Sequence, residues 1–111
     1  MTLLKAIYNV LKKRVKLTDS FITYSELISQ LPAPYNKMSP RNKLLHEALG
    51  EIVTKCHAQK LAALSALVVN KQFNRPGAGY FIVAHPKVKD PEKAWVKEVN
   101  QIKTCKYPSS L

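Results

Sequence analysis

The sequence has few of the residues from which disulfide frameworks and metal centres are built. It contains two cysteines, Cys56 and Cys105, and three scattered histidines, with no metal-ligand spacing among them. A disulfide scaffold or a zinc site is therefore not expected, and the sequence indicates no metal ion and no cofactor. Cys56 falls on the apolar side of an expected helix, where a small buried residue fits.

Long apolar runs are also missing. No stretch of the sequence is long enough to cross a bilayer, and no secretory leader is recognisable. We therefore expect an intracellular, cytoplasmic protein with reduced thiols and no membrane partner. Apolar residues still make up 46% of the chain, which is typical of a globular protein, and the length suits one domain over residues 1–111.

Acidic residues are scarce in this sequence. Eighteen Lys and Arg face seven Asp and Glu, which gives a net charge of +11. A surplus of this size favours a polyanionic partner, because phosphates neutralised by protein cations release their counterions. The charge by itself does not distinguish DNA from RNA or from an acidic protein surface.

The scarcity of carboxylates also argues against catalysis. No pair of Asp or Glu residues has an evident acid–base spacing, and Ser65 has no histidine beside it that would activate a nucleophile. We therefore expect a protein that is not an enzyme.

The first half of the chain predicts an N-terminal helix and a helix-turn-helix. Apolar residues recur every three or four positions within residues 1–17, which is the helical period. The helix-turn-helix is predicted over residues 23–59. Thr23 and Glu26 have the spacing of a capping box and open its first helix, and Pro32 prevents that helix from continuing.

The second helix of this pair is predicted over residues 40–58. Ser39 is in the position of an N-cap and Pro40 in that of the first helical residue, and both types are favoured there. Leu45, Leu49 and Ile52 lie on its apolar side.

A β-hairpin is predicted over residues 64–85. The segments "LSALVVN" and "GYFIVAHP" are rich in apolar and β-branched residues. Between them Pro76 and Gly77 fit the central positions of a type II turn, for which Gly77 would supply a positive φ. Gly79 would let the chain re-enter the sheet. Because a strand is expected to follow, we assign the glycines to turn geometry and not to a phosphate-binding loop.

The last helix is predicted over residues 91–104, with Asp90 as N-cap and Pro91 at its first position. Trp95, Val99 and Ile102 are spaced to dock it on the body. The complete order predicts an α+β fold of the winged helix-turn-helix class, with a three-helix core, a β-hairpin wing and a C-terminal helix.

Three short motifs carry a family resemblance. "ITYSEL", "ALG" and "LVVN" resemble the DNA-binding domain of O6-alkylguanine-DNA alkyltransferases and alkyltransferase-like proteins. The resemblance implies a winged helix-turn-helix in which Tyr24 matches a family tyrosine, and it places Lys43 where the family has an arginine. That family has Pro-Cys-His-Arg or Pro-Trp-His-Arg immediately before a Val-Val pair. Residues 64–67 are Leu-Ser-Ala-Leu here, so the resemblance supports the fold and not the reaction.

Two groups of residues are candidates for contacting nucleic acid. The first comprises Arg41, Asn42, Lys43 and His46, because recognition helices present their N-terminal side chains to base edges. Cations at a helix N-terminus oppose the helix dipole at a cost of about 0.3–1 kcal/mol each, which slightly favours a functional role. Ordinary first-turn surface residues are the alternative, and Glu47 and Glu51 argue for it because acids would repel phosphates.

The second group lies on the loop between the two expected strands, where side chains can reach phosphates or a minor groove. It comprises Lys71, Gln72, Asn74 and Arg75. Tyr24 is a further candidate contact. For Phe73 we favour packing onto the core over stacking or insertion.

The leading hypothesis is a DNA-binding protein that uses helix 40–58 and loop 71–78 on duplex DNA, as a small transcription regulator of a bacterium or phage. The alternative is a protein-interaction module, an inhibitor or adaptor that binds a nucleic-acid-processing machine or an acidic protein surface. For RNA the sequence offers only charge.

Overall fold

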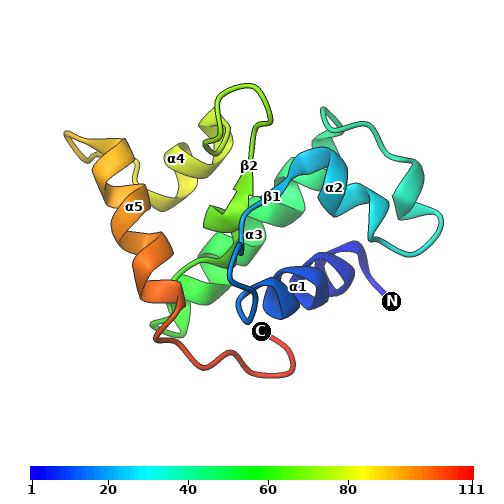
Figure 1. Cartoon of the computed structure of the whole chain (residues 1–111), viewed down its shortest axis with the longest axis horizontal. Coiled ribbons are helices and arrows are strands. Elements are labelled where there is room, and N and C mark those ends of the chain that lie inside the picture. Colours follow the sequence, from blue (N-terminus) through cyan, green and yellow to red (C-terminus); the bar gives the residue numbers. More distant parts are fainter.

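The computed structural model describes residues 1–111 and is a compact α+β fold with a radius of gyration of 12.8 Å, close to the value of about 13 Å expected for a single domain of this size. It has five α-helices, two short 3₁₀ helices and a two-stranded sheet (Figure 1). In chain order the elements are α1 (Leu3–Arg14), β1 (Ile22–Thr23), α2 (Tyr24–Ser29), η1 (Tyr35–Lys37), α3 (Lys43–Ala58), η2 (Leu64–Leu67), β2 (Val68–Val69), α4 (Ala78–Ala84) and α5 (Pro91–Ile102).

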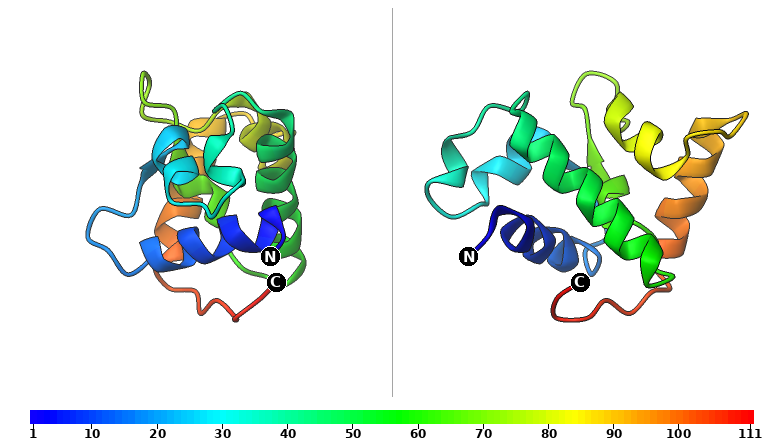
Figure 2. Two further views of the ribbon diagram at one scale, coloured as in Figure 1. Left: turned by 90° about the vertical axis from the view of Figure 1, so that its right-hand side faces the viewer. Right: turned by 180° about the vertical axis from the view of Figure 1, so that it is seen from behind.

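Helix α3 is the central element of the molecule. Helices α1 and α4 both pack on it, as does the buried segment that contains η2 (Figure 2). Its apolar side consists of Leu45, Ala48, Leu49, Ile52, Val53 and Cys56, and all six are buried. These side chains follow the predicted stripe, and Cys56 is a core residue as expected.

Several helix ends agree with the sequence prediction because their signals are local. The Thr23 hydroxyl accepts from the Glu26 N–H, and the Glu26 carboxylate accepts from the Thr23 N–H, which completes the capping box. Asp90 caps α5, with Pro91 at its first position. Trp95 and Ile102 of α5 are buried, as its docking stripe requires.

The third helix begins later than predicted. Ser39 and Pro40 precede a turn, and α3 starts at Lys43 with Asn42 as its N-cap. The Asn42 side chain accepts from the Leu44 N–H at 2.8 Å, whereas the Ser39 hydroxyl accepts from the Arg41 N–H. Both side chains can cap a helix, and the helix uses Asn42 instead of the predicted Ser39.

The predicted β-hairpin over residues 64–85 is wrong. Residues 64–67 form the 3₁₀ helix η2, and β2 pairs in parallel with β1, with Ile22 opposite Val68 and Thr23 opposite Val69. The intervening helices α2 and α3 supply the crossover that two parallel strands need.

The second predicted strand is instead helix α4. Its aromatic and β-branched residues favour a strand, but the helix buries Tyr80 and packs against α3. Val83 of α4 lies beside Gly50 of α3, where an added Cβ would stand 3.6 Å from the Val83 side chain, an ordinary contact distance. No neighbouring strand lies beside this segment, and a two-stranded hairpin alone is only marginally stable.

The predicted type II turn at Pro76 and Gly77 is also wrong. No glycine in the chain has a positive φ, and Gly77 is the N-cap of α4 at φ −70°. The left-handed residue of the loop is Asn74, at φ 53°, a conformation that asparagine tolerates better than most residues.

A buried carboxylate joins α3, α4 and α5. Glu98 is 5% exposed, and its Oε1 accepts from the Tyr80 hydroxyl at 2.5 Å. Its Oε2 accepts from the Ala63 N–H at 3.0 Å and lies 2.7 Å from His57 Nε2. His85 Nε2 is 3.3 Å from Oε1 and 3.0 Å from the Tyr80 oxygen. We name Glu98, Tyr80, His57 and His85 the Glu98 cluster.

Raising the pH above about 10 is expected to lower the free energy of unfolding. Burial and the hydrogen bond to Glu98 raise the pKa of Tyr80, and burial raises the pKa of Tyr107. An unfolded tyrosine loses its proton near pH 10, whereas these two keep theirs, so the unfolded state binds fewer protons above this pH and stability falls as the pH rises. Urea titrations on both sides of that pH measure the decline. Tyr80→Phe should make it shallower, and an unchanged stability would contradict the prediction.

Candidate nucleic-acid interface

Three segments that carry predicted contact residues meet at Tyr24. They are the start of α2, the start of α3 and the loop of residues 70–77, and they lie along the upper edge of Figure 1. The Gly77 N–H donates to the Tyr24 hydroxyl at 2.9 Å, and the rings of Tyr24 and His46 have centroids 5.3 Å apart. Tyr24 therefore links the loop to the N-terminal part of α3.

The Tyr24 hydroxyl keeps its own proton for a further partner. Burial raises its pKa, although the hydrogen bond from Gly77 acts in the opposite direction, so the phenol is neutral at physiological pH. Its oxygen accepts from Gly77 and donates to no group of the protein. Such a hydroxyl can donate to a phosphate oxygen.

Two of the four contact residues predicted at the start of α3 have side chains that are available to a partner. Arg41 is exposed, and the Lys43 side chain is 88% exposed with only an i,i+4 pair to Glu47 at 3.8 Å, a weak interaction. Asn42 is used as the N-cap, so its oxygen is not free to read a base. His46 Nε2 lies 2.8 Å from the Pro40 carbonyl and donates to it.

The loop projects its polar residues from a closed turn. The Asn74 N–H donates to the Asn70 carbonyl and the Asn70 N–H to the Arg75 carbonyl, both at 2.7 Å. Lys71, Gln72 and Asn74 are exposed between these bonds. Three of the four predicted loop residues are therefore available to a partner. The turn that carries them is held by backbone hydrogen bonds.

Arg75 does not lie at the tip of the loop. Its guanidinium is 5.3 Å from the centre of the Phe81 ring and 3.8 Å from the Glu92 carboxylate. It faces α4 and α5, and no local signal predicts this because Glu92 lies 17 positions further along the chain.

The expectation that Phe73 packs onto the core is wrong. Phe73 is 64% exposed. It lies on a loop whose turn is closed by backbone hydrogen bonds of Asn70, Asn74 and Arg75, and its exposed ring is available for stacking.

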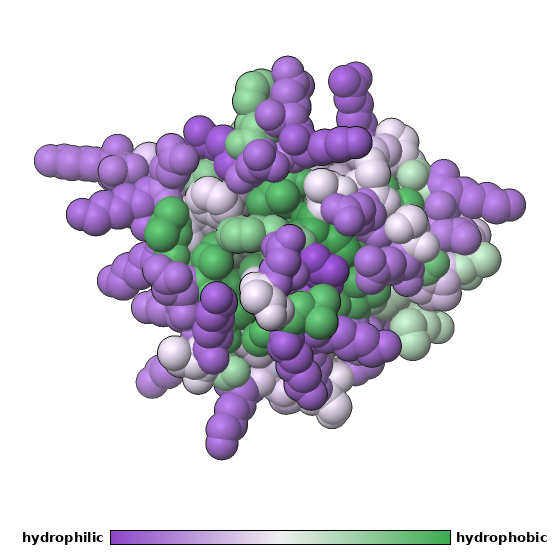
Figure 3. Space-filling model, viewed as in Figure 1, coloured by the Kyte–Doolittle hydropathy of each residue, from purple (hydrophilic) through white to green (hydrophobic).

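The exposed charges around this surface include three cations and two acids, which are Arg41, Lys43, Lys71, Glu26 and Glu47. Figure 3 shows hydrophilic side chains projecting along the upper edge. Hydrogen bonds from Thr23 hold the pKa of Glu26 below its usual range, with the charges of Arg14 and Lys71 acting in the same direction.

No group of three or more His, Cys, Asp and Glu side chains could hold a metal ion. No helix is both long and apolar enough to cross a membrane. Comparison with protein families, with curated proteins and with solved structures gives no match.

Replacing Tyr24 with phenylalanine is expected to lower the free energy of unfolding by about 1 kcal/mol. The change removes the acceptor of the Gly77 N–H and releases the loop from α2. Urea unfolding measures the stability, and hydrogen exchange at the Gly77 amide measures the release.

Tyr35→Phe is the matched control, because the Tyr35 hydroxyl donates to the Met1 carbonyl away from the loop. It should leave the exchange of the Gly77 amide unchanged. Equal exchange in wild type and Tyr24→Phe would show that this hydrogen bond does not hold the loop.

Proposed function

We propose that this protein binds duplex DNA without catalysing a reaction, as a helix-turn-helix protein related to the winged-helix class. The start of α3 is its recognition element, and the loop of residues 70–77 takes the place of a wing. Arg41, Lys43, Lys71, Gln72 and Asn74 make the contacts, and Tyr24 donates to a phosphate. His46 positions Tyr24 through the contact of their rings.

The observation that carries this proposal is the convergence at Tyr24. One side chain bonds the loop and packs on α3, so cations from segments about 30 residues apart belong to one surface. Phosphate contacts from separate segments fix a protein on a duplex. The net charge of +11 supplies the attraction.

The side chains that could act as nucleophiles support a non-enzymatic function. The Ser65 hydroxyl is buried and donates to the Leu49 carbonyl at 2.6 Å. Cys56 is fully buried, and burial raises the pKa of its thiol, which disfavours the reactive thiolate.

We expect the affinity for random duplex DNA to fall steeply with salt concentration. Because each phosphate contact releases counterions, Lys43→Ala and Lys71→Ala should each lower the slope of log K against log salt by about one. Fluorescence anisotropy across a salt series measures the slope.

Lys103→Ala is the matched control, since it removes the same charge just after α5, a helix that carries none of the proposed contacts. It should change the slope much less than the other two substitutions. An absence of duplex binding at low salt, or equal slopes for all three variants, would contradict the proposal.

A protein partner is the second candidate, because α4 leaves apolar side chains uncovered. Ile82 is 68% exposed and Val83 42% exposed, and exposed apolar side chains that gather together mark interaction sites. If duplex binding fails, a pulldown compared between wild type and Ile82→Asp tests this function.

A further inference from the structure

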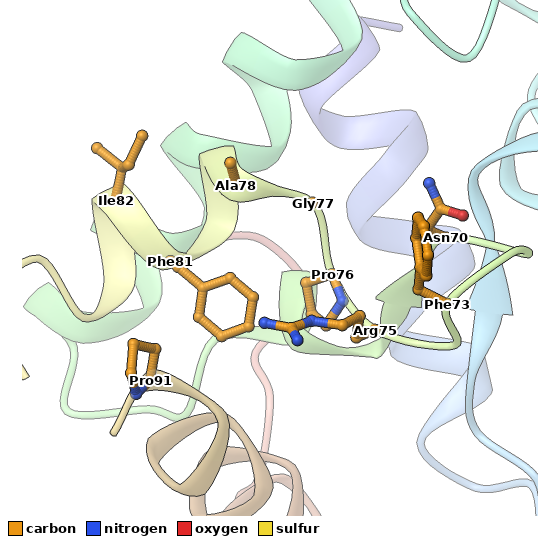
Figure 4. A pocket seen from close by; sticks show the side chains of 9 residues that line it. All are labelled: Asn70, Phe73, Arg75, Pro76, Gly77, Ala78, Phe81, Ile82 and Pro91. Carbon is orange, nitrogen blue, oxygen red and sulfur yellow. The ribbon is translucent and has the colours of Figure 1, made fainter. Parts of the chain in front are cut away.

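A hollow of about 550 Å³ lies between the loop of residues 70–77 and helices α4 and α5. Figure 4 shows Phe73 and Asn70 on one side of it and Phe81, Ile82 and Pro91 on the other, with Arg75 and Pro76 between them. Its volume is within the range of small-ligand sites, about 300–1,000 Å³. It adjoins the proposed duplex surface, because Gly77 both lines the hollow and bonds Tyr24.

Arg75 offers a flat cationic surface in this hollow. Its guanidinium lies over the Phe81 ring at 5.3 Å and is paired with Glu92 at 3.8 Å. The contact with the ring and the ion pair both favour this orientation, and the side chain is still partly exposed. Guanidinium planes and aromatic rings are the surfaces on which proteins stack unpaired bases.

Phe73 provides a second stacking surface at the edge of the hollow. It is 64% exposed, and the backbone hydrogen bonds of the loop hold the turn that carries it. A phenylalanine ring has only two rotatable side-chain bonds, so it loses little conformational freedom when a planar ligand stacks on it.

Asn70 adds a group that can recognise a polar edge. Its side-chain oxygen accepts from the Gln72 N–H at 2.7 Å, which sets the orientation of the amide. The amide nitrogen makes no hydrogen bond within the protein, so it can donate to a ring nitrogen or carbonyl oxygen of a ligand.

We propose that this hollow binds an unpaired nucleobase in a strand that continues from the bound duplex. Two planar surfaces, a cation and a free amide donor match the faces and edge of a base. A paired base within a duplex has no free face for Phe73, so the ligand is single-stranded. Lys71 on the same loop can contact the phosphate of that strand. This inference rests on the proposed function, because it extends the same surface.

The test compares three labelled DNAs by fluorescence anisotropy. They are a blunt duplex, the same duplex with a short thymine overhang, and the same duplex with an overhang of abasic sites. Because the two overhangs have equal charge, their affinity ratio measures recognition of the base. We expect the thymine overhang to bind about 5- to 150-fold more tightly than the abasic one.

Phe73→Ala should bring this ratio close to one while the affinity for the blunt duplex is unchanged. The ring is mostly exposed, so the variant should fold, and its thermal transition verifies this. Arg75→Lys keeps the positive charge and removes the planar guanidinium. It should lower the affinity ratio of the thymine to the abasic overhang about 2- to 5-fold.

The outcomes separate this inference from the proposed function. A ratio of one in the wild type, or a ratio that Phe73→Ala leaves unchanged, overturns the inference while binding of the blunt duplex still supports the duplex proposal. A protein segment as the natural occupant would also give a ratio of one. Base-dependent binding of the overhang without binding of the blunt duplex supports the hollow and contradicts the duplex proposal. No binding of any of the three DNAs overturns both.

Discussion

Glu98→Ala is expected to lower the free energy of unfolding by about 3–5 kcal/mol, the loss seen when one member of a buried charged group is removed. The carboxylate is 5% exposed and accepts from Tyr80 and from the Ala63 N–H. Alanine leaves these donors and the two histidines of the Glu98 cluster without their acceptor. A domain of this kind has about 5–15 kcal/mol of total stability, so the loss is a large fraction of it.

The substitution should also release α4, which Tyr80 ties to α5. Helix α4 follows the loop that carries Phe73 and Arg75, so the affinity for DNA is expected to fall with the stability. Urea unfolding measures the free energy, and hydrogen exchange at the amides of α4 measures the release.

Glu98→Gln is the matched control, because it keeps the size of the side chain and removes its charge. Its amide can still accept at one oxygen but places a donor toward groups that also donate, so it should cost less than alanine, about 1–3 kcal/mol. If Glu98→Ala costs less than about 1 kcal/mol, the cluster does not hold the helices together.

Trp95→Ala is expected to lower the free energy of unfolding by about 3–5 kcal/mol. Trp95 is 8% exposed, and its indole N–H donates to the buried Ala66 carbonyl at 2.8 Å. Its ring also contacts Phe21, with centroids 5.9 Å apart. Alanine leaves a cavity where α5 docks and leaves that carbonyl without its donor.

Trp95→Phe separates the two contributions. It keeps most of the apolar volume and removes the indole donor, so it should cost about 1–3 kcal/mol. Urea unfolding of both variants checks the difference. Equal losses for phenylalanine and alanine would assign the whole effect to the hydrogen bond, and no loss in either would show that α5 is not needed for the fold.

The sequence contains one signal for the Glu98 cluster that the sequence prediction did not include. Glu98 stands on the apolar stripe of α5 between Trp95 and Ile102. A carboxylate is rarely buried without partners, so its position on that stripe could have marked it. Its partners could not have been found, because Tyr80 and His57 reach it only after three helices have packed.

The sequence by itself determined the elements whose signals lie within a few residues. The capping box at Thr23, the Asp90 and Pro91 start of α5 and the buried stripe of α3 were all predicted and are all observed. Helical spacing and capping depend on neighbours three or four positions away, and these neighbours are the same in every fold the chain could adopt.

Tertiary structure decided the segment from residue 64 to residue 85. Strand propensity there predicted a hairpin, yet Val68 and Val69 pair with β1, and Tyr80 turns inward from a helix to meet Glu98. A strand needs a partner edge and a buried tyrosine needs an acceptor, and both are supplied by residues remote in sequence. The same long-range contacts turned Arg75 toward Glu92 and left Phe73 in solvent, because local propensity does not determine which surfaces other elements will cover.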